Sequence, residues 1–178
     1  MGWGRTMVNS LLRKYVNKIS KKKIKIVGFF IFFILNFRSP KYKIFFMLCH
    51  ITDVKVRYGE TDQMGVVYHG NYAQYLEIGR TDWLSALGFS YKSMEMEGLM
   101  LPVVVLNINY CKPAFYDDIL TIKTTLIKMP KVSIEFDYEI KNAQGELITT
   151  AYSKLVFVDA KTRSPRQCPQ IFLDQLHN

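Results

Sequence analysis

An aspartate and a histidine, Asp62 and His69, flank a glycine turn directly before a long helical pattern. Gly65, three residues after Asp62, permits a backbone conformation that is closed to other residues. The first amides of the predicted helix point back toward this turn, and their unpaired N–H groups can stabilise an oxygen that becomes negative during a reaction. The residues therefore predict a reaction site with Asp62 near the helix N-terminus, although an Asp in such a turn is more often a turn former than a catalyst.

Two elements must position this turn. An alternating segment at 54–58 predicts a strand before it, and a period of about 3.6 residues predicts a helix over 71–87 after it. Asn71 is the expected N-cap with Gln74 completing a capping box, and Gly88 stands where a C′ glycine would. One stripe of the helix is expected to be buried: Tyr72, Leu76, Gly79, Trp83 and Leu87.

Two longer motifs carry a resemblance to a known family. Residues 58–72 read YGETDQMGVVYHGNY, which resembles the signature of the hotdog-fold 4-hydroxybenzoyl-CoA thioesterase family, particularly its bacterial acyl-CoA thioesterase branch. Residues 112–122, KPAFYDDILTI, look like the family's second recurring stretch, and the similarity extends from about Thr52 to Pro169. The resemblance implies that Asp62 is the catalytic aspartate, which either attacks the thioester carbonyl or activates a water.

The resemblance also assigns residues around Asp62. It implies that the oxyanion donor is the backbone amide of His69, with Gly70 adjoining, and that the His69 side chain contributes. Tyr58 stands where a pocket tyrosine occurs in the family. By residue type alone, His69 is also readable as a capping or packing residue and Tyr58 as an ordinary core aromatic. Glu60 is expected to be an exposed, solvated loop acid that at most orients a neighbour.

After the helix, residues 89–100 predict a short surface helix or lid that ends at Gly98. Strands are predicted from Val-rich or alternating segments at 101–110, 119–127, 132–140 and 147–158. A turn at 142–145 joins the last two, so the last three strands are expected to form an antiparallel meander. No internal repeat or second domain is indicated.

One strand, one long helix and four further strands indicate an α+β fold in which the helix covers the apolar face of one sheet. A single-domain hotdog fold, with an antiparallel sheet wrapped around one long central helix, meets this requirement. The resemblance implies a homodimer whose two active sites form at the interface, or a homotetramer.

Residues 1–46 differ in composition from the rest of the chain. They hold 11 of the 24 Lys and Arg and none of the 15 Asp and Glu, so the remaining residues, with 13 basic and 15 acidic side chains, carry a net charge of −2. The overall charge of +9 is therefore no argument for nucleic-acid binding.

Three interpretations of residues 1–46 compete. An apolar stretch at 26–35 is shorter than the roughly 20 residues of a membrane span, and no small-residue cleavage site follows it, so an anchor or signal peptide is poorly supported. The opening Met-Gly fits a short myristoylation pattern. From Arg13 to Phe46, 25 of 34 residues are of types that A/T-rich codons specify, which favours a natural start at Met47 and a domain over 47–178.

The residue inventory excludes several other chemistries. The three cysteines include no Cys-x-x-Cys pair, so they indicate neither a disulfide framework nor a zinc site, and they fit a reducing, cytoplasmic setting. No His or carboxylate set has metal-ligand spacing, and neither a Gly-rich phosphate loop nor a Gly-x-Ser-x-Gly elbow is present. We expect no metal and no cofactor apart from coenzyme A as part of the substrate.

A coenzyme A substrate carries phosphates, so a cationic rim is expected near the mouth of the substrate tunnel. Lys128, Lys131 and Arg163 are candidate substrate-binding residues, in turns or strand ends that also hold Lys161 and Arg166. Such residues are mostly plain solvated charges. The sequence leaves open the acyl chain length, and whether the acyl group is aromatic or aliphatic.

The favoured function is an acyl-CoA thioesterase that hydrolyses a thioester to a free acid and coenzyme A. A hotdog hydratase or dehydratase would need an arrangement such as Asp-x-Asn-Pro-x-His, which residues 62–66 do not match. Loss of Asp62 would have indicated a non-catalytic acyl-CoA or acyl-carrier-protein binding module, and Asp62 is present. The choice between a coenzyme A and a carrier-protein thioester stays open.

Overall fold

Five alternating segments pair into one antiparallel sheet, in the order β1-β4-β5-β6-β3. The computed structural model describes residues 49–177. Its sheet consists of β1 (Cys49–Lys55), β3 (Val103–Tyr110), β4 (Ile119–Leu126), β5 (Ser133–Lys141) and β6 (Leu147–Val156). A separate short pair joins β2 (Leu99–Met100) to β7 (Val158–Asp159). The predicted meander of β4, β5 and β6 is confirmed, and β1 and β3 form the two edges.

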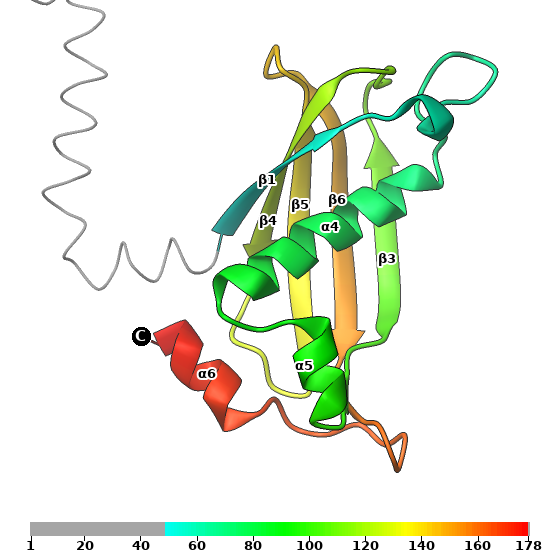
Figure 1. Ribbon diagram of the computed structural model, residues 1–178. Helices are drawn as coiled ribbons and strands as arrows, with labels where there is room; N and C mark the ends of the chain where they lie inside the picture. Colours follow the sequence, from blue (N-terminus) through cyan, green and yellow to red (C-terminus); the bar gives the residue numbers. More distant parts are fainter. Residues whose placement is uncertain (1–48, 178) are drawn as a thin grey trace, which may run out of the picture. The chain divides into compact units, whose positions relative to one another are not determined.

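Helix α4 (Asn71–Ala86) lies across one face of this sheet (Figure 1). Strand alternation places apolar residues on the face that α4 covers, and from β5 these are Ile134, Phe136, Tyr138 and Ile140, all buried. From α4 the core receives Tyr72, Tyr75, Leu76, Trp83 and Leu84. The α+β prediction is confirmed, because one sheet and one long helix share one core.

Two shorter helices lie at the end of the sheet where β3 begins (Figure 1). The predicted surface helix is α5 (Tyr91–Met96), and the chain leaves it through Gly98 at φ +76°. Helix α6 (Gln170–His177) was not predicted. Its Phe172 is buried against the rings of Trp83, Phe89 and Phe157. The C-terminal segment therefore closes the aromatic end of the core.

The C-terminal end of α4 follows the prediction. Gly88 has φ +85° and its amide donates to the Ser85 carbonyl, while the Phe89 amide donates to the Leu84 carbonyl at 3.0 Å. This pair of hydrogen bonds is a Schellman motif, which requires a left-handed residue that glycine adopts without strain.

The N-terminal end of α4 differs from the prediction. Gly70 is the N-cap and no side chain caps the helix, so the predicted capping box at Asn71 is wrong. Asn71 begins the helix, and its Nδ2 donates to the Glu60 carbonyl at 2.7 Å because the preceding loop folds back onto the helix. The predicted strand at 54–58 is also displaced, since β1 ends at Lys55 and Tyr58–Glu60 form a 3-10 turn.

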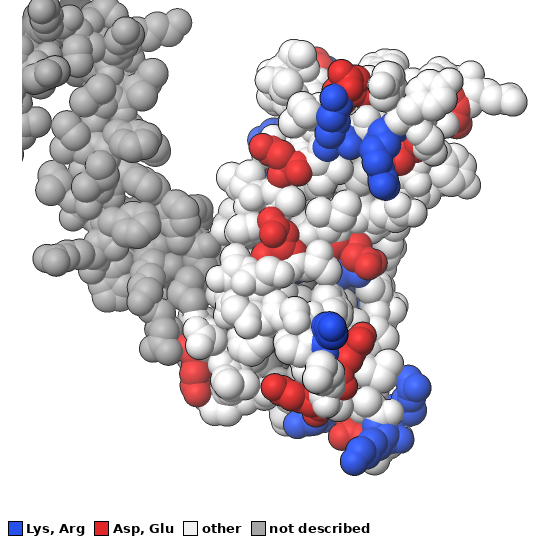
Figure 2. All heavy atoms as spheres, viewed as in Figure 1, with Lys and Arg blue, Asp and Glu red and all other residues white. Residues whose placement is uncertain are grey.

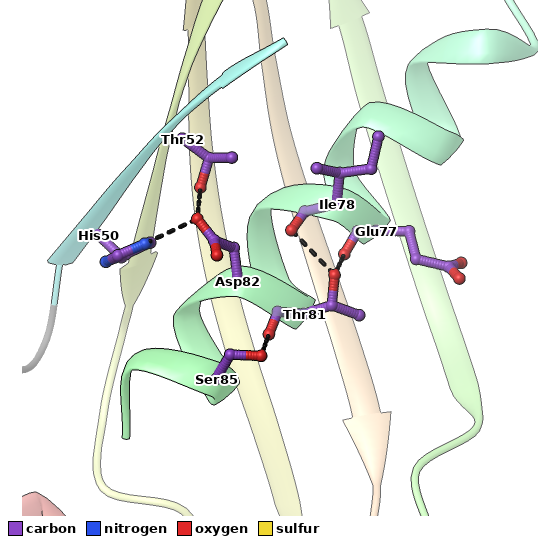
Figure 3. Close-up of polar contacts among 7 residues, drawn as sticks. All are labelled: His50, Thr52, Glu77, Ile78, Thr81, Asp82 and Ser85. Atoms are coloured by element: carbon purple, nitrogen blue, oxygen red, sulfur yellow. Dashed lines mark hydrogen bonds and ion pairs between the residues drawn. The ribbon is translucent and has the colours of Figure 1, made fainter. Parts of the chain in front are cut away.

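A polar tie joins the middle of α4 to the edge strand β1. His50 and Thr52 point from β1 toward Asp82 on the helix (Figure 3), with distances of 2.9 Å from His50 Nε2 and 2.8 Å from Thr52 Oγ1 to Asp82 Oδ2. The hydrogen bonds from Thr52 and then from His50 hold the pKa of the Asp82 carboxyl below its ordinary value. This exposed tie links α4 to β1 beside the buried face of the helix.

The predicted membrane-related and start-site features at residues 1–46 lie outside the described residues. Of the helices formed by residues 49–177, none combines the length and the apolar character that crossing a membrane requires.

Gly79 sets how closely α4 approaches the sheet. A Cβ at this position would lie 2.6 Å from Thr124 Oγ1 and 2.9 Å from Ile122 Cγ2, both on β4. Gly79→Ala should therefore lower the free energy of unfolding by about 1–3 kcal/mol, as overpacking does, although alanine has the higher helix propensity. Ser85→Ala, at an exposed position of the same helix, is the control and should change it by no more than about 0.5 kcal/mol. Urea unfolding of both variants measures this, and a Gly79→Ala protein as stable as the wild type would contradict the close approach.

Candidate active site

A pocket of about 330 Å³ opens where the loop before α4 meets the end of β3. Its lining consists of Asp62, Met64, Val66, Val67, His69, Tyr72, Tyr110, Cys111, Lys112 and Pro113. The structure thus brings Asp62 and His69 together, as the position of both residues before the helix suggested.

The Asp62 carboxylate is held by its own turn. The Met64 amide donates to Asp62 Oδ1 at 2.8 Å, the Gly65 amide donates to the Asp62 carbonyl at 2.9 Å, and the Asp62 amide donates to the Val66 carbonyl at 2.9 Å. Gly65 has φ +76°, the left-handed conformation expected of it. Within residues 49–177, Oδ2 accepts no hydrogen bond, so one oxygen of a carboxylate in the pocket wall is uncommitted.

The turn before α4 presents backbone donors. The Asn71 amide donates to the Tyr68 carbonyl at 2.9 Å, and the Tyr110 hydroxyl donates to the His69 carbonyl at 3.1 Å. Across the described part of the chain, the amides of His69 and Gly70 find no protein acceptor. A Cβ at Gly70 would lie 2.7 Å from the ring of the exposed Tyr68, so a larger residue there would displace that ring. Two uncommitted N–H groups at the positive end of a helix dipole can stabilise an oxyanion.

The other walls of the pocket combine aromatic and aliphatic side chains with one lysine. The buried Tyr72 ring packs edge-to-face against Tyr110, with the ring centroids 5.2 Å apart. Lys112 Nζ lies 2.6 Å from an oxygen of Glu146, which is in the turn between β5 and β6. Cys111 is exposed beside it. The pocket can therefore hold an apolar group, while the charge of Lys112 is balanced by Glu146.

Two residues just before Asp62 have surroundings unlike those expected. Glu60 was expected to be an exposed acid, which is wrong: it is only 6% exposed and its carboxylate is paired with the Arg57 guanidinium at 2.6 Å. The pairing removes the need for solvation that otherwise keeps a carboxylate at the surface. Tyr58 lies outside the pocket, 79% exposed, with its ring edge-to-face against Tyr116 at 5.5 Å.

The predicted cationic residues also lie outside the pocket. Lys128 and Lys131 lie between β4 and β5, and Arg163 follows β7. The strand register puts them at the end of the sheet where β3 begins at Val103, whereas the pocket lies where β3 ends at Tyr110. Figure 2 shows basic side chains, with acidic ones among them, at the lower end of the face in view, where Figure 1 has the orange loop that follows β6. Within one chain, these residues are not brought to Asp62.

Comparison with known proteins identifies the family. Residues 64–149 match the Thioesterase superfamily. The chain is 40% identical over 122 residues to YneP of Bacillus subtilis, provisionally named an acyl-CoA thioesterase, and the match covers 68% of this chain and 88% of YneP. This chain belongs to the thioesterase superfamily.

Two further members of the thioesterase superfamily extend the likeness. YbgC of Escherichia coli, named an acyl-CoA thioester hydrolase, is 35% identical over 117 residues, which are 66% of this chain and 87% of YbgC. The crystal structure of a DHNA-CoA thioesterase from Staphylococcus aureus superposes with a TM-score of 0.67 at 43% identity, covering 71% of this chain and 85% of that one. The predicted family and the hotdog fold are confirmed.

Several pocket residues of this thioesterase-superfamily member were missed by sequence reasoning. Tyr110, Cys111 and Lys112 stand at the end of β3 and at the start of the KPAFYDDILTI motif, and that adjacency was the only signal of their place. Among the residues described, no group of three or more His, Cys, Asp or Glu side chains is placed to hold a metal ion.

Proposed function

We propose that this protein hydrolyses acyl-CoA thioesters to a free acid and coenzyme A, with Asp62 as the reacting carboxylate. The observation that supports it most strongly is the meeting, in one pocket, of an uncommitted Asp62 oxygen with His69, which lies just before the start of α4 and whose amide is uncommitted. Such a site supplies both a nucleophile or base and a place for developing negative charge. The relatives named as acyl-CoA thioesterases support the same substrate class.

The reaction follows one of two routes. In the first, the Asp62 carboxylate attacks the thioester carbonyl carbon, the C–S bond breaks to release the coenzyme A thiolate, and water then hydrolyses the mixed anhydride. In the second, Asp62 takes a proton from a water that attacks the same carbon, and the proton passes to the leaving thiolate. A carboxylate is ionised at neutral pH, so neither route needs a partner that first deprotonates it.

Both routes place negative charge on the carbonyl oxygen. The amide of His69, with that of Gly70 adjoining, is the proposed donor to this oxyanion, and these two amides have no acceptor among residues 49–177. Because a backbone donor and the helix dipole are fixed before the reaction starts, they need no reorganisation when the charge appears. The His69 side chain, which is exposed in the pocket wall, would add a further polar contact. No metal or redox cofactor is needed.

The protein is proposed to act as a homodimer that pairs through β3, or as a homotetramer that contains this pair. Within the described residues, this edge strand has a hydrogen-bonded partner on one side only, β6, and most of its apolar residues are exposed. They are Val103, Val104, Val105, Leu106 and Tyr110. A long apolar edge strand invites pairing with another strand, and pairing with a second copy about a two-fold axis covers both edges at once.

Pairing of two β3 strands would also bring the cationic residues to a pocket. In an antiparallel pair the Val103 end of one strand lies beside the Tyr110 end of the other. The end of the sheet that carries Lys128, Lys131 and Arg163 would then face the partner's pocket, where coenzyme A phosphates need cations. These three residues stay proposed substrate contacts, and so does Tyr58.

A cytoplasmic location is part of the proposal. Cys49, Cys111 and Cys168 are free thiols, which suits a reducing compartment that also supplies coenzyme A. An acyl carrier protein could present the same thioester, since the proposed chemistry acts on the thioester carbonyl that both substrates carry. The acyl chain length and the choice between aromatic and aliphatic groups stay open.

Asp62→Asn keeps the size of the side chain and a hydrogen-bond acceptor for the turn but removes the charge and basicity. It should lower kcat by roughly 10²-fold or more, as the loss of a general base does, with substrate binding and melting temperature nearly unchanged. His69→Ala should cost less, because the main donor there is the backbone amide. Thiol release from a panel of acyl-CoA and acyl-carrier-protein substrates measures these effects.

The matched control is Asp118→Asn. Its carboxylate also accepts a backbone amide, from Phe115 at 2.8 Å, but does not line the pocket. Its kcat should stay near the wild-type value. An Asp62→Asn protein that folds and turns over the best substrate at the wild-type rate would make Asp62 a turn residue only; Asp62→Ser and Asp62→Ala repeat the test if Asp62→Asn does not fold.

Leu106→Lys tests the proposed dimer. Leu106 on β3 is 39% exposed, and a lysine there should place a charge in the interface and convert the dimer to a monomer with lowered activity. Ile51→Lys, on the opposite edge strand β1 and 62% exposed, should leave the assembly intact. Multi-angle light scattering reports the mass of each variant. A wild-type monomer with full turnover would remove the shared interface from the proposal.

A further inference from the structure

Glu60 carries a buried carboxylate that accepts four hydrogen bonds, all from Arg57 and Tyr75. Oε1 accepts from Arg57 Nε at 2.8 Å and from Arg57 Nη2 at 2.6 Å. Oε2 accepts from the Arg57 backbone amide at 2.7 Å and from the Tyr75 hydroxyl at 2.9 Å. Tyr75 is fully buried in α4, so the carboxylate links the 3-10 turn directly to the helix.

The backbone of Glu60 makes a second link to the same helix. Its carbonyl accepts from Asn71 Nδ2 at 2.7 Å and from the Tyr68 amide at 2.9 Å. Asn71 is the first residue of α4, and Tyr68 directly precedes His69. Glu60 therefore makes two links. Its side chain is bound to Tyr75 in α4, and its carbonyl is bound to Tyr68 and Asn71, which lie on either side of His69 and Gly70.

The electrostatics agree with an ionised carboxylate. Burial raises the pKa of Glu60, but the hydrogen bonds from the Arg57 side chain, the Arg57 amide and Tyr75 together outweigh it and hold the pKa below its ordinary value. For Tyr75, burial and the neighbouring carboxylate raise the pKa well above its ordinary value. The carboxylate therefore accepts, and the phenol donates, across the physiological range.

We propose that Glu60 is a positioning residue that fixes Asp62 relative to the His69 and Gly70 amides. Asp62 lies two residues after Glu60, and the two amides lie between its partners Tyr68 and Asn71. The inference rests on the proposed thioesterase function, because it concerns the geometry of that site. Glu60 does not line the pocket and touches no substrate; it acts by holding the two halves of the site at one separation.

A neutral side chain cannot make the same contacts. In Glu60→Gln one oxygen becomes an NH₂ group, which would face either the Arg57 guanidinium or the Arg57 amide beside the Tyr75 hydroxyl. Both Arg57 groups can only donate, so in either orientation a donor would face a donor. The loop would shift, and a displacement of about 1 Å in a reaction site can cost about 10²-fold in rate. Tyr75→Phe is expected to have a smaller effect on the rate, because it removes only the hydroxyl that joins the carboxylate to α4.

The test compares Tyr75→Phe and Glu60→Gln with Tyr138→Phe. Tyr138 is also buried, and its hydroxyl is hydrogen-bonded to Ser153 Oγ at 2.8 Å in the sheet, away from the pocket. All three variants should lower the melting temperature. Measured well below it, kcat should fall by roughly 10²-fold for Glu60→Gln and by roughly tenfold for Tyr75→Phe, with KM within about twofold of the wild type, and should be unchanged for Tyr138→Phe. Hydrogen exchange of the segment 57–71 should rise in the first two variants only.

Each outcome decides the proposal. A Tyr75→Phe protein with wild-type kcat, or one that loses no more activity than Tyr138→Phe, means that Glu60 only stabilises the fold. A raised KM with unchanged kcat would make it a substrate-binding determinant instead. If the wild-type protein releases no thiol from any thioester, the proposed function itself is overturned. If the wild type is active and Tyr75→Phe leaves kcat unchanged, only the role of Glu60 is overturned. If Glu60→Gln does not fold, Tyr75→Phe alone decides.

Discussion

The structure depends on how closely α4 lies against the sheet. At Gly79 no Cβ fits between the helix and β4, since it would come within 2.6 Å of Thr124. Trp83 and Tyr75 fill the core on either side of this contact. At the exposed side of the helix, Asp82 is hydrogen-bonded to β1. A helix held this tightly has a fixed N-terminus. That terminus is where the pocket opens, so the geometry of the core determines the geometry of the reaction site.

The site therefore divides into a rigid half and a loop half. The rigid half is the start of α4 with its uncommitted amides, and the loop half is the turn that carries Asp62. A loop has many conformations that cost little, so a catalyst in a loop needs an anchor. The buried Glu60 carboxylate, held by Arg57 and Tyr75, is that anchor in our proposal.

The sequence predicted the features that depend on local pattern and not those that depend on tertiary contacts. The helix over 71–87, the alternating strands and the left-handed Gly65 and Gly88 are periodic or conformational signals, and they were found. The capping box was wrong because the N-cap is Gly70, one residue before the predicted one, and the Asn71 side chain instead donates to a carbonyl eleven residues earlier. Glu60 was placed at the surface because nothing local shows that Arg57 and Tyr75 converge on it. Helix α6 was missed because it is short and its place depends on tertiary burial: Phe172 and Leu176 are both buried, and Phe172 packs against aromatic rings from distant segments.

The central claim is that the thioester carbonyl lies between Asp62 and the amide of His69. A crystal structure with a ketone analogue of acyl-CoA, in which a methylene separates carbonyl and sulfur, tests it most directly. We expect the carbonyl oxygen about 3 Å from the His69 amide nitrogen and the carbonyl carbon about 3–3.5 Å from an Asp62 oxygen, or joined to it by one water. An analogue whose carbonyl contacts neither residue, with its acyl group outside the pocket, would contradict the account.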